Sequence, residues 1–171
     1  MLEQLDFQEC DEFPELILQK LDLPNIQSVK FKVVRCDIKH GDKQLRMLVT
    51  NVLWLAQIKS LNLDAVSVSE DTLLWTLRRL PLLRNLTLAS RERVSCKTTK
   101  RLSERPTVRR EWLCPLLEEL EFGLCPRLLE SDVIVLVDAR VNVIPSSAQA
   151  STISPSLLRK VIWNGRDMAS G

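Results

Sequence analysis

Residues 114–126, which read CPLLEELEFGLCP, decide the fold of this chain. Counted from Leu117 as offset 0, apolar side chains stand at offsets 0, 3 and 5 (Leu117, Leu120 and Phe122), and glutamates fill the positions between them. Such alternation is the period of a short β-strand that buries one face and exposes the other. The stretch therefore predicts a strand whose leucines enter a core.

The same apolar spacing occurs six times, starting at Leu2, Ile26, Ile58, Leu83, Leu117 and Leu158. Among the side chains at offsets 2, 4 and 6, only Ala89 and Ile162 are apolar. Leucine fills 31 of the 171 positions, nearly twice its ordinary share. A unit that recurs in this way predicts a repeat protein with one short strand in each repeat.

Helical signals follow several of these strands. The segment 69–77 opens with a serine and two acids, which favour a helix N-terminus, and it carries a leucine stripe. Ser131 and Asp132 open a similar segment, and residues 42–56 carry a less sharp apolar face. Because each strand returns through a helix on one side, neighbouring strands must pair in parallel. We therefore expect an α/β solenoid of about six irregular repeats, with a curved parallel sheet on the concave face and helices on the convex face.

The chain reads as one repeat domain, residues 1–171, with two interruptions. Residues 91–111 hold eight bases and three acids, a net charge of +5, and residues 142–156 are rich in Ser, Ala, Thr and Pro. The basic stretch has few apolar side chains, too few to offset the entropy lost when its backbone becomes ordered. We therefore expect both interruptions to be irregular, exposed loops. Residues 1–25, by contrast, carry seven acids and one base.

Composition excludes several classes of protein. The four glycines cannot form a Walker loop or a dinucleotide-binding fingerprint. The five cysteines contain no CxxC pair and no zinc or haem spacing, which favours a reduced protein of the cytoplasm or nucleus. The acidic start is not that of a signal peptide, and no apolar run is long enough to cross a bilayer.

Catalysis is not expected either. His40 is the single histidine, and it lies between Lys39 and Gly41 in what reads as a surface turn, without a partner at a spacing that would identify a catalytic triad. The acids of residues 118–121 are predicted to be solvated, so they form no metal site. The four tryptophans stand beside core leucines and read as core. The sequence thus predicts a protein that is not an enzyme and uses no cofactor and no metal.

Residues 114–126 resemble, almost letter for letter, the cysteine-containing leucine-rich repeats of F-box proteins, and the predicted helix 131–140 follows them. Cys10 takes the same offset in the first repeat as Cys125 in the fifth, where the family places Asn or Cys to bond backbone groups beyond the strand. Four repeats have other residues there, so such a ladder is incomplete: Val34, Val66, Arg91 and Arg166. The whole chain is similar to the C-terminal repeat regions of F-box-like proteins of fungi.

This resemblance implies a protein-interaction module that recognises substrates for ubiquitin-dependent degradation. No F-box precedes Leu2, and Pro14–Leu18 is more simply the helix of the first repeat, so a Skp-type adaptor is expected as a partner only if an F-box lies upstream. The partner would be a protein bound by the outward side chains of the strands through complementary charge and hydrogen bonds. We predict that these side chains are Asp6, Lys30, Lys32, Asn62, Asp64, Asn85, Thr87, Glu119 and Glu121.

An alternative function is the binding of an anion or nucleic acid by the basic interruption. Its cations could neutralise phosphates, and they are Arg91, Arg93, Lys97, Lys100, Arg101, Arg105, Arg109 and Arg110. Within this stretch, however, no aromatic side chain is interleaved to stack on bases, and no groove-reading motif is present. A nucleic acid is therefore the less favoured partner, and a solvated loop explains the charge more simply.

Overall fold

The computed structural model describes residues 3–8, 25–32, 37–51, 57–89, 94–105, 112–141 and 156–168. The strands are β1 (Gln4–Gln8), β2 (Ser28–Lys32), β3 (Ser60–Asp64), β4 (Asn85–Ala89), β5 (Glu119–Phe122), β6 (Lys160–Trp163) and β7 (Arg166–Asp167). The helices are α2 (Ile38–Asn51), α3 (Glu70–Leu77), α4 (Cys96–Ser103) and α5 (Glu130–Val141). Within these ranges no helix combines the length and the apolar character that crossing a bilayer demands.

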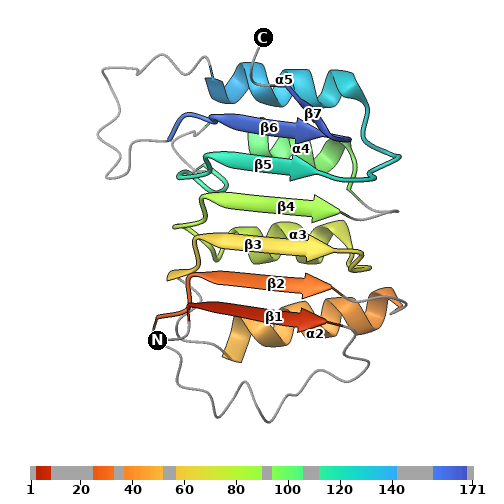
Figure 1. Cartoon of the computed structure of the whole chain (residues 1–171). Helices are drawn as coiled ribbons and strands as arrows, with labels where there is room; N and C mark the ends of the chain where they lie inside the picture. Colours follow the sequence, from red (N-terminus) through yellow and green to blue (C-terminus); the bar gives the residue numbers. More distant parts are fainter. Residues whose placement is uncertain are drawn as a thin grey trace.

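All the strands belong to one sheet, in which they follow one another in chain order. The pairs from β1 to β6 are parallel, and β7 is antiparallel to β6. The four helices all lie on one face of this sheet (Figure 1). Right-handed crossovers between parallel strands in sequential order place the connecting helices on the same side, so none of the described helices covers the opposite face. We call that opposite face the outer face.

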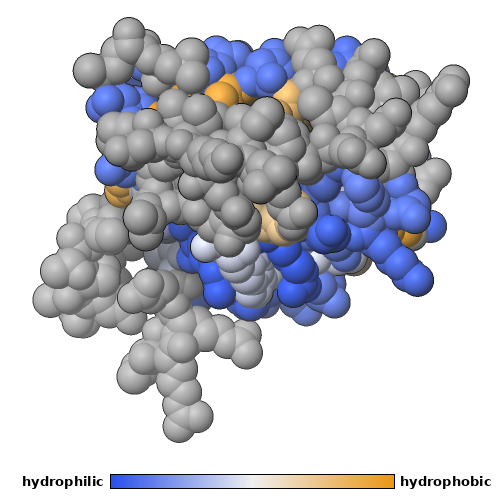
Figure 2. Space-filling model, turned by 90° about the horizontal axis from the view of Figure 1, so that it is seen from below, coloured by the Kyte–Doolittle hydropathy of each residue, from blue (hydrophilic) through white to orange (hydrophobic). Residues whose placement is uncertain are grey.

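The register aligns the apolar positions of successive strands. Leu61 of β3 faces Leu86 of β4, which faces Leu120 of β5, and all three are buried. The repeat starts at Ile26, Ile58, Leu83, Leu117 and Leu158 are buried as well. The predicted positions of all six parallel strands are thereby confirmed, because Leu5 and Phe7 lie in β1, which pairs in parallel with β2. The repeat start at Leu2 itself lies outside the described residues. Viewed toward the β1 end, the coloured surface is mostly hydrophilic (Figure 2).

Helix α3 forms where the sequence predicts it, because Ser69 caps its N-terminus. The Ser69 hydroxyl accepts a hydrogen bond from the backbone N–H of Thr72 at 3.2 Å. Helix α5 begins at Glu130, one residue before the predicted Ser131. Helix α3 therefore follows from a local capping serine. In α5, Ser131 lies inside the helix, and Asp132 accepts from the backbone N–H of Leu129 at 3.1 Å.

Helix α2 begins earlier than predicted, and His40 with Gly41 belongs to its first turns rather than to a surface turn. A Cβ at Gly41 would lie 2.1 Å from the carbonyl oxygen of Ser67. Glycine at this position thus allows the helix to approach the backbone that follows β3, a close contact that any side chain would prevent.

The prediction that residues 91–110 form an irregular, exposed loop is wrong for helix α4. Val94, Thr98, Thr99 and Leu102 are buried, so this short helix covers the core with threonines as well as apolar side chains. A count of apolar residues underestimated what the segment can bury. Residues 91–93, 106–111 and 142–155 lie outside the described residues, so the rest of the loop prediction stays a prediction.

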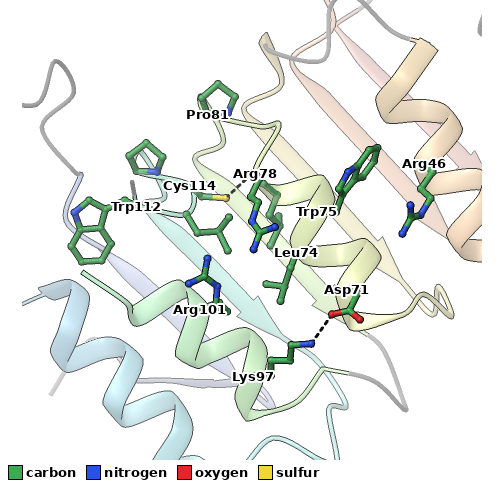
Figure 3. A pocket seen from close by; sticks show the side chains of 13 residues that line it. Arg46, Asp71, Leu74, Trp75, Arg78, Pro81, Lys97, Arg101, Trp112 and Cys114 are labelled. Atoms are coloured by element: carbon green, nitrogen blue, oxygen red, sulfur yellow. Dashed lines mark hydrogen bonds and ion pairs between the residues drawn. The ribbon is translucent and has the colours of Figure 1, made fainter. Parts of the chain in front are cut away.

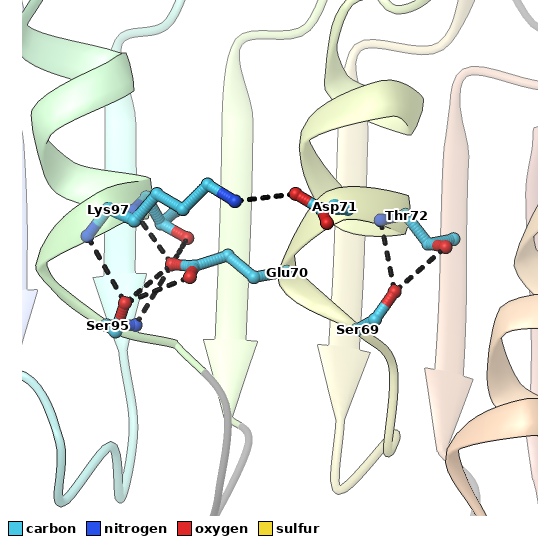
Figure 4. Close-up of polar contacts among 7 residues, drawn as sticks. Ser69, Glu70, Asp71, Thr72, Ser95 and Lys97 are labelled. Atoms are coloured by element: carbon cyan, nitrogen blue, oxygen red, sulfur yellow. Dashed lines mark hydrogen bonds and ion pairs between the residues drawn. The ribbon is translucent and has the colours of Figure 1, made fainter.

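Helix α4 is capped from the neighbouring repeat. The Glu70 carboxylate of α3 accepts hydrogen bonds from the backbone N–H of Thr98 at 2.8 Å, the Thr98 hydroxyl at 2.6 Å and the Ser95 hydroxyl at 2.9 Å (Figure 4). Similarly, the Asp42 carboxylate of α2 accepts from the backbone N–H of Ser69 at 2.6 Å. Each of these acids holds the start of the next helix, which fixes neighbouring repeats against each other.

The sheet ends in a hairpin that the repeat pattern does not predict. Asn164 and Gly165 connect β6 to β7 with φ angles of +48° and +80°. Positive φ at both central residues is the geometry of a type I′ turn, and Asn-Gly is its preferred sequence. The local signal was therefore present in the sequence but does not belong to the repeat.

Candidate functional site

The outer face of the sheet carries three rows of side chains that cross the strands. The first row contains Gln4, Ser28, Ser60, Asn85, Glu119 and Lys160. The second row contains Asp6, Lys30, Asn62, Thr87, Glu121 and Ile162. The third row contains Lys32, Asp64 and Ala89. The strand register thus places all nine predicted partner-binding residues in these rows.

The β1–β3 part of the outer face carries paired charges. Lys30 Nζ lies 3.8 Å from Asp6 Oδ2, and Lys32 Nζ lies 3.8 Å from Asp64 Oδ2. These side chains are about one third exposed or more, so water and salt screen their attraction. The pairs contribute little to stability and remain accessible to charged groups of a partner.

The β4–β6 part of the outer face presents acceptors. Asn85 Nδ2 donates to Glu119 Oε2 at 2.9 Å, and Thr87 Oγ1 donates to Glu121 Oε2 at 3.5 Å. These four side chains border a shallow depression of about 40 Å³, which Lys160 and Ile162 also line. The neighbouring donors orient the two carboxylates while leaving them exposed. The depression therefore offers two oriented carboxylates beside the Lys160 cation and the partly exposed Ile162 side chain, with the buried Leu86 and Leu120 also in its lining.

The basic residues of the interruption that the structure describes do not all line one site. Of the eight, the structure describes Lys97, Lys100, Arg101 and Arg105. Lys97 and Arg101 line an open groove of about 890 Å³ on the helix side of the molecule (Figure 3). Lys100 and Arg105 are exposed and do not line it. Arg91, Arg93, Arg109 and Arg110 lie outside the described residues.

This helix-side groove was not predicted because its lining comes from three repeats. It is lined by Arg46, Asp71, Leu74, Trp75, Leu77, Arg78, Pro81, Lys97, Arg101, Trp112, Leu113, Cys114 and Pro115. The prediction that the tryptophans belong to the core needs correction, since Trp75 and Trp112 are only partly buried and line the groove. Trp163 is partly buried and packs against the core, whereas Trp54 lies outside the described residues.

Buried cysteines bond the backbone of the preceding repeat. Cys125 Sγ donates to the carbonyl oxygen of Leu88 at 3.3 Å, and Cys114 Sγ donates to that of Leu77 at 3.5 Å. Burial raises the pKa of the Cys114 thiol to about 12, so it remains a protonated donor. The Cys114 thiol therefore acts structurally, because a nucleophile needs the thiolate. The Cys125 contact is of the type that the repeat resemblance implies.

The described residues contain no cluster of three His, Cys, Asp or Glu side chains that could hold a metal ion. His40 is half-buried near the start of α2, and its backbone N–H donates to Asp37 Oδ1 at 2.7 Å. His40 Nε2 is buried and has no hydrogen-bond partner among the described residues.

Compared with known proteins, the chain matches no family model and no curated protein.

Proposed function

We propose that this chain is a non-enzymatic interaction module, a solenoid of the leucine-rich-repeat type whose outer face binds a partner protein. One observation carries the proposal: the strand register turns side chains from successive repeats into continuous polar rows on a face that the helices leave open. A parallel array holds such rows rigidly, so little conformational entropy is lost when a partner docks.

The outer face also sets the chemistry of the partner. Glu119 and Glu121 supply carboxylates across β5, and Ile162 adds an apolar contact beside them. A complementary surface would carry arginine or lysine side chains around an apolar residue. Such charge complementarity favours specificity and rapid association more than raw affinity.

The biological role that we propose is recognition of a substrate for ubiquitin-dependent degradation. It rests on the resemblance of residues 114–126 to the cysteine-containing repeats of F-box proteins. In proteins of that kind the F-box contacts the Skp-type adaptor and the repeats contact the substrate. The proposal therefore assigns substrate recognition to this chain.

The test uses a photoreactive side chain introduced at Thr87, followed by identification and purification of the captured protein. We expect Thr87→Arg and Glu121→Arg to weaken binding of that purified protein by about tenfold or more, because both place positive charge opposite a basic surface. In cells, loss of the chain should lengthen the lifetime of the same protein.

The matched control is Arg127→Glu, an exposed charge change that lies outside the three rows. It should leave the affinity unchanged. Equal binding by the Thr87 and Glu121 variants and the parent would refute the proposed surface. A partner whose lifetime does not depend on the chain would refute the degradation role and leave the binding surface intact.

A further inference from the structure

We propose that the helix-side groove binds a short acidic peptide segment that carries an apolar side chain. The groove lies on the face opposite the three rows, so this binding site is separate from the proposed partner surface. Its lining comes from α2, α3, α4 and the segment before β5 (Figure 3). A ligand in it would therefore contact several repeats at once.

The floor of the groove is apolar. The apolar surface that a ligand can reach comes from the exposed Pro81 and the partly buried Trp75, Trp112 and Pro115. Leu74, Leu77, Leu113 and Cys114 also line the groove but are each 5 % exposed or less. The volume of about 890 Å³ is of the size that accepts a few peptide side chains. An apolar floor with a polar edge is the arrangement of protein and peptide interfaces.

The groove is positively charged. Among the described residues that line it, four cations stand against the single carboxylate of Asp71, which gives 4 − 1 = +3. Lys97 pairs with Asp71 at 2.6 Å, and Arg101 pairs with Glu104. Arg46 and Arg78 form no ion pair within the described ranges. These two guanidinium groups are available to a carboxylate from outside.

Cation–π contacts and a hydrogen bond hold guanidinium groups in place beside the groove. The Arg46 guanidinium carbon lies 5.3 Å from the Trp75 ring centroid, and Arg46 Nε donates to Thr72 Oγ1 at 3.2 Å. The guanidinium carbon of Arg79 lies 3.8 Å from the same centroid. A guanidinium that is already oriented loses less entropy when it bonds a carboxylate.

The same contacts favour a peptide over a nucleic acid. The Trp75 ring already carries two guanidinium groups, so a nucleobase would have to displace one of them in order to stack. A free inorganic anion would use the cations but leave the apolar floor in water. Tryptophan and arginine beside a desolvated apolar surface are the residues that dominate protein-binding hot spots.

The experiment measures fluorescence anisotropy of a labelled peptide made of glutamate and leucine, with the full chain as receptor. Two matched peptides replace glutamate by lysine or leucine by serine. We expect the first peptide to bind about tenfold or more tightly than either of the others. Its binding should weaken as salt is added, because exposed charges are screened.

Variants locate the site. Arg78→Glu with Lys97→Glu should weaken binding of the glutamate–leucine peptide by about tenfold or more. The matched control combines Arg127→Glu with Arg159→Glu, which changes the net charge equally at two exposed positions outside the groove. The control should keep the parent affinity, and circular dichroism confirms that both double variants are folded.

Several results would overturn the inference: equal binding of the lysine–leucine peptide, unchanged affinity of the Arg78 and Lys97 double variant, or binding of oligouridylate in place of the peptide. Thr87→Arg should leave peptide binding unchanged. A loss with Thr87→Arg alone would move the peptide to the outer face and overturn the groove as its site. Failure of this inference is thereby separated from failure of the proposed function.

Discussion

Arg140 Nε donates a hydrogen bond over 2.7 Å to the carbonyl oxygen of Leu102, which ties helix α5 to the last turn of helix α4. The same guanidinium donates to the carbonyl oxygens of Cys114, at 3.2 Å, and of Leu113. It lies 4.4 Å from the centroid of the Trp112 ring. The side chain is fully buried, so its charge is compensated by carbonyl dipoles, including those at the end of α4.

Replacing this arginine should cost more stability than replacing any exposed arginine. Arg140→Leu removes this donor from the carbonyl oxygens of Leu102, Leu113 and Cys114, of which that of Cys114 keeps the backbone N–H of Leu117. We expect the free energy of unfolding to fall by about 3 kcal/mol. Arg140→Lys should recover part of the loss, because it restores one charged donor. Urea unfolding measures both. The exposed Arg127→Ala should change stability by about 0.5 kcal/mol or less, and equal losses at the two positions would contradict the buried network.

Removal of the Glu70 cap should loosen α4 first. Glu70→Ala deprives the backbone N–H of Ser95 of its acceptor and leaves that of Thr98 with the Ser95 carbonyl alone. We expect a loss of about 1 to 2 kcal/mol. Trypsin should then cut within α4, at Lys97 or Arg101, faster than in the parent. The control is Glu121→Gln, which changes an exposed carboxylate on the outer face and should leave the cutting rate nearly unchanged. Equal rates in Glu70→Ala and the parent would show that α4 does not need this cap.

Gly41→Ala should reverse the usual effect of alanine in a helix. Replacement of a helical glycine by alanine ordinarily stabilises by about 1 kcal/mol. Here the new Cβ would lie 2.1 Å from the Ser67 carbonyl oxygen, and relief of that contact should cost about 1 to 3 kcal/mol. Thermal unfolding therefore should show a lower midpoint for Gly41→Ala, and a higher midpoint would contradict the close approach.

The inward and outward assignments of the strands can be tested in one pair. Leu86→Ala removes a central core side chain and should cost about 2 to 5 kcal/mol. Its outward neighbour Thr87→Ala should change stability by about 0.5 kcal/mol or less. Chemical denaturation distinguishes the two, and similar effects would mean that β4 faces the other way.

Alkaline pH should weaken the contribution of Cys114. Burial raises the pKa of this thiol from 9.0 to about 12, so between those values the unfolded chain loses the proton while the folded chain keeps it. The contribution of the protonated thiol to the free energy of unfolding is therefore fully present below pH 9. It decreases as the pH rises, by up to about 1.4 kcal/mol per pH unit.

Arg140 acts in the opposite direction, because burial lowers its pKa to about 10. The cost of burying its charge in the folded state is relieved above that value. The interval from pH 9 to 10 thus isolates the thiol. Between pH 9 and 10, measured in reducing buffer, the unfolding free energy of the parent should fall relative to that of Cys114→Ala. A constant difference would contradict the raised pKa.

Local patterns were sufficient to predict the strands and two helix starts. Apolar alternation marks β2 to β6, and Ser69 carries its own capping signal. Helix α4 was missed although Ser95 is its N-cap and accepts from the backbone N–H of Lys97 at 3.2 Å. The segment has few apolar residues, and its second anchor, Glu70, lies 25 residues before Ser95. A short stretch of sequence indicates only local propensity, whereas the hydrogen bonds from Ser95 and Thr98 to Glu70 join two repeats.

Arg140 shows which signal was overlooked. It follows Val133 and Leu136 by seven and four residues, so it falls on the buried stripe of α5. An arginine on such a stripe predicts a buried guanidinium with acceptors nearby. The helix-side groove had no comparable signal, because tryptophans and cations far apart in the chain meet only when α2, α3 and α4 pack side by side.

The capping acids also couple the opening of neighbouring helices in one direction along the chain. Asp42 of α2 holds Ser69 at the start of α3, and Glu70 of α3 in turn holds Ser95 at the start of α4. Helix α4 can open while α3 keeps its own cap, whereas opening of α3 removes Glu70 and releases α4 with it. Fluctuations that reach α3 must therefore include α4, but the reverse does not hold. Amide hydrogens of α4 should exchange with solvent at least as fast as those of α3.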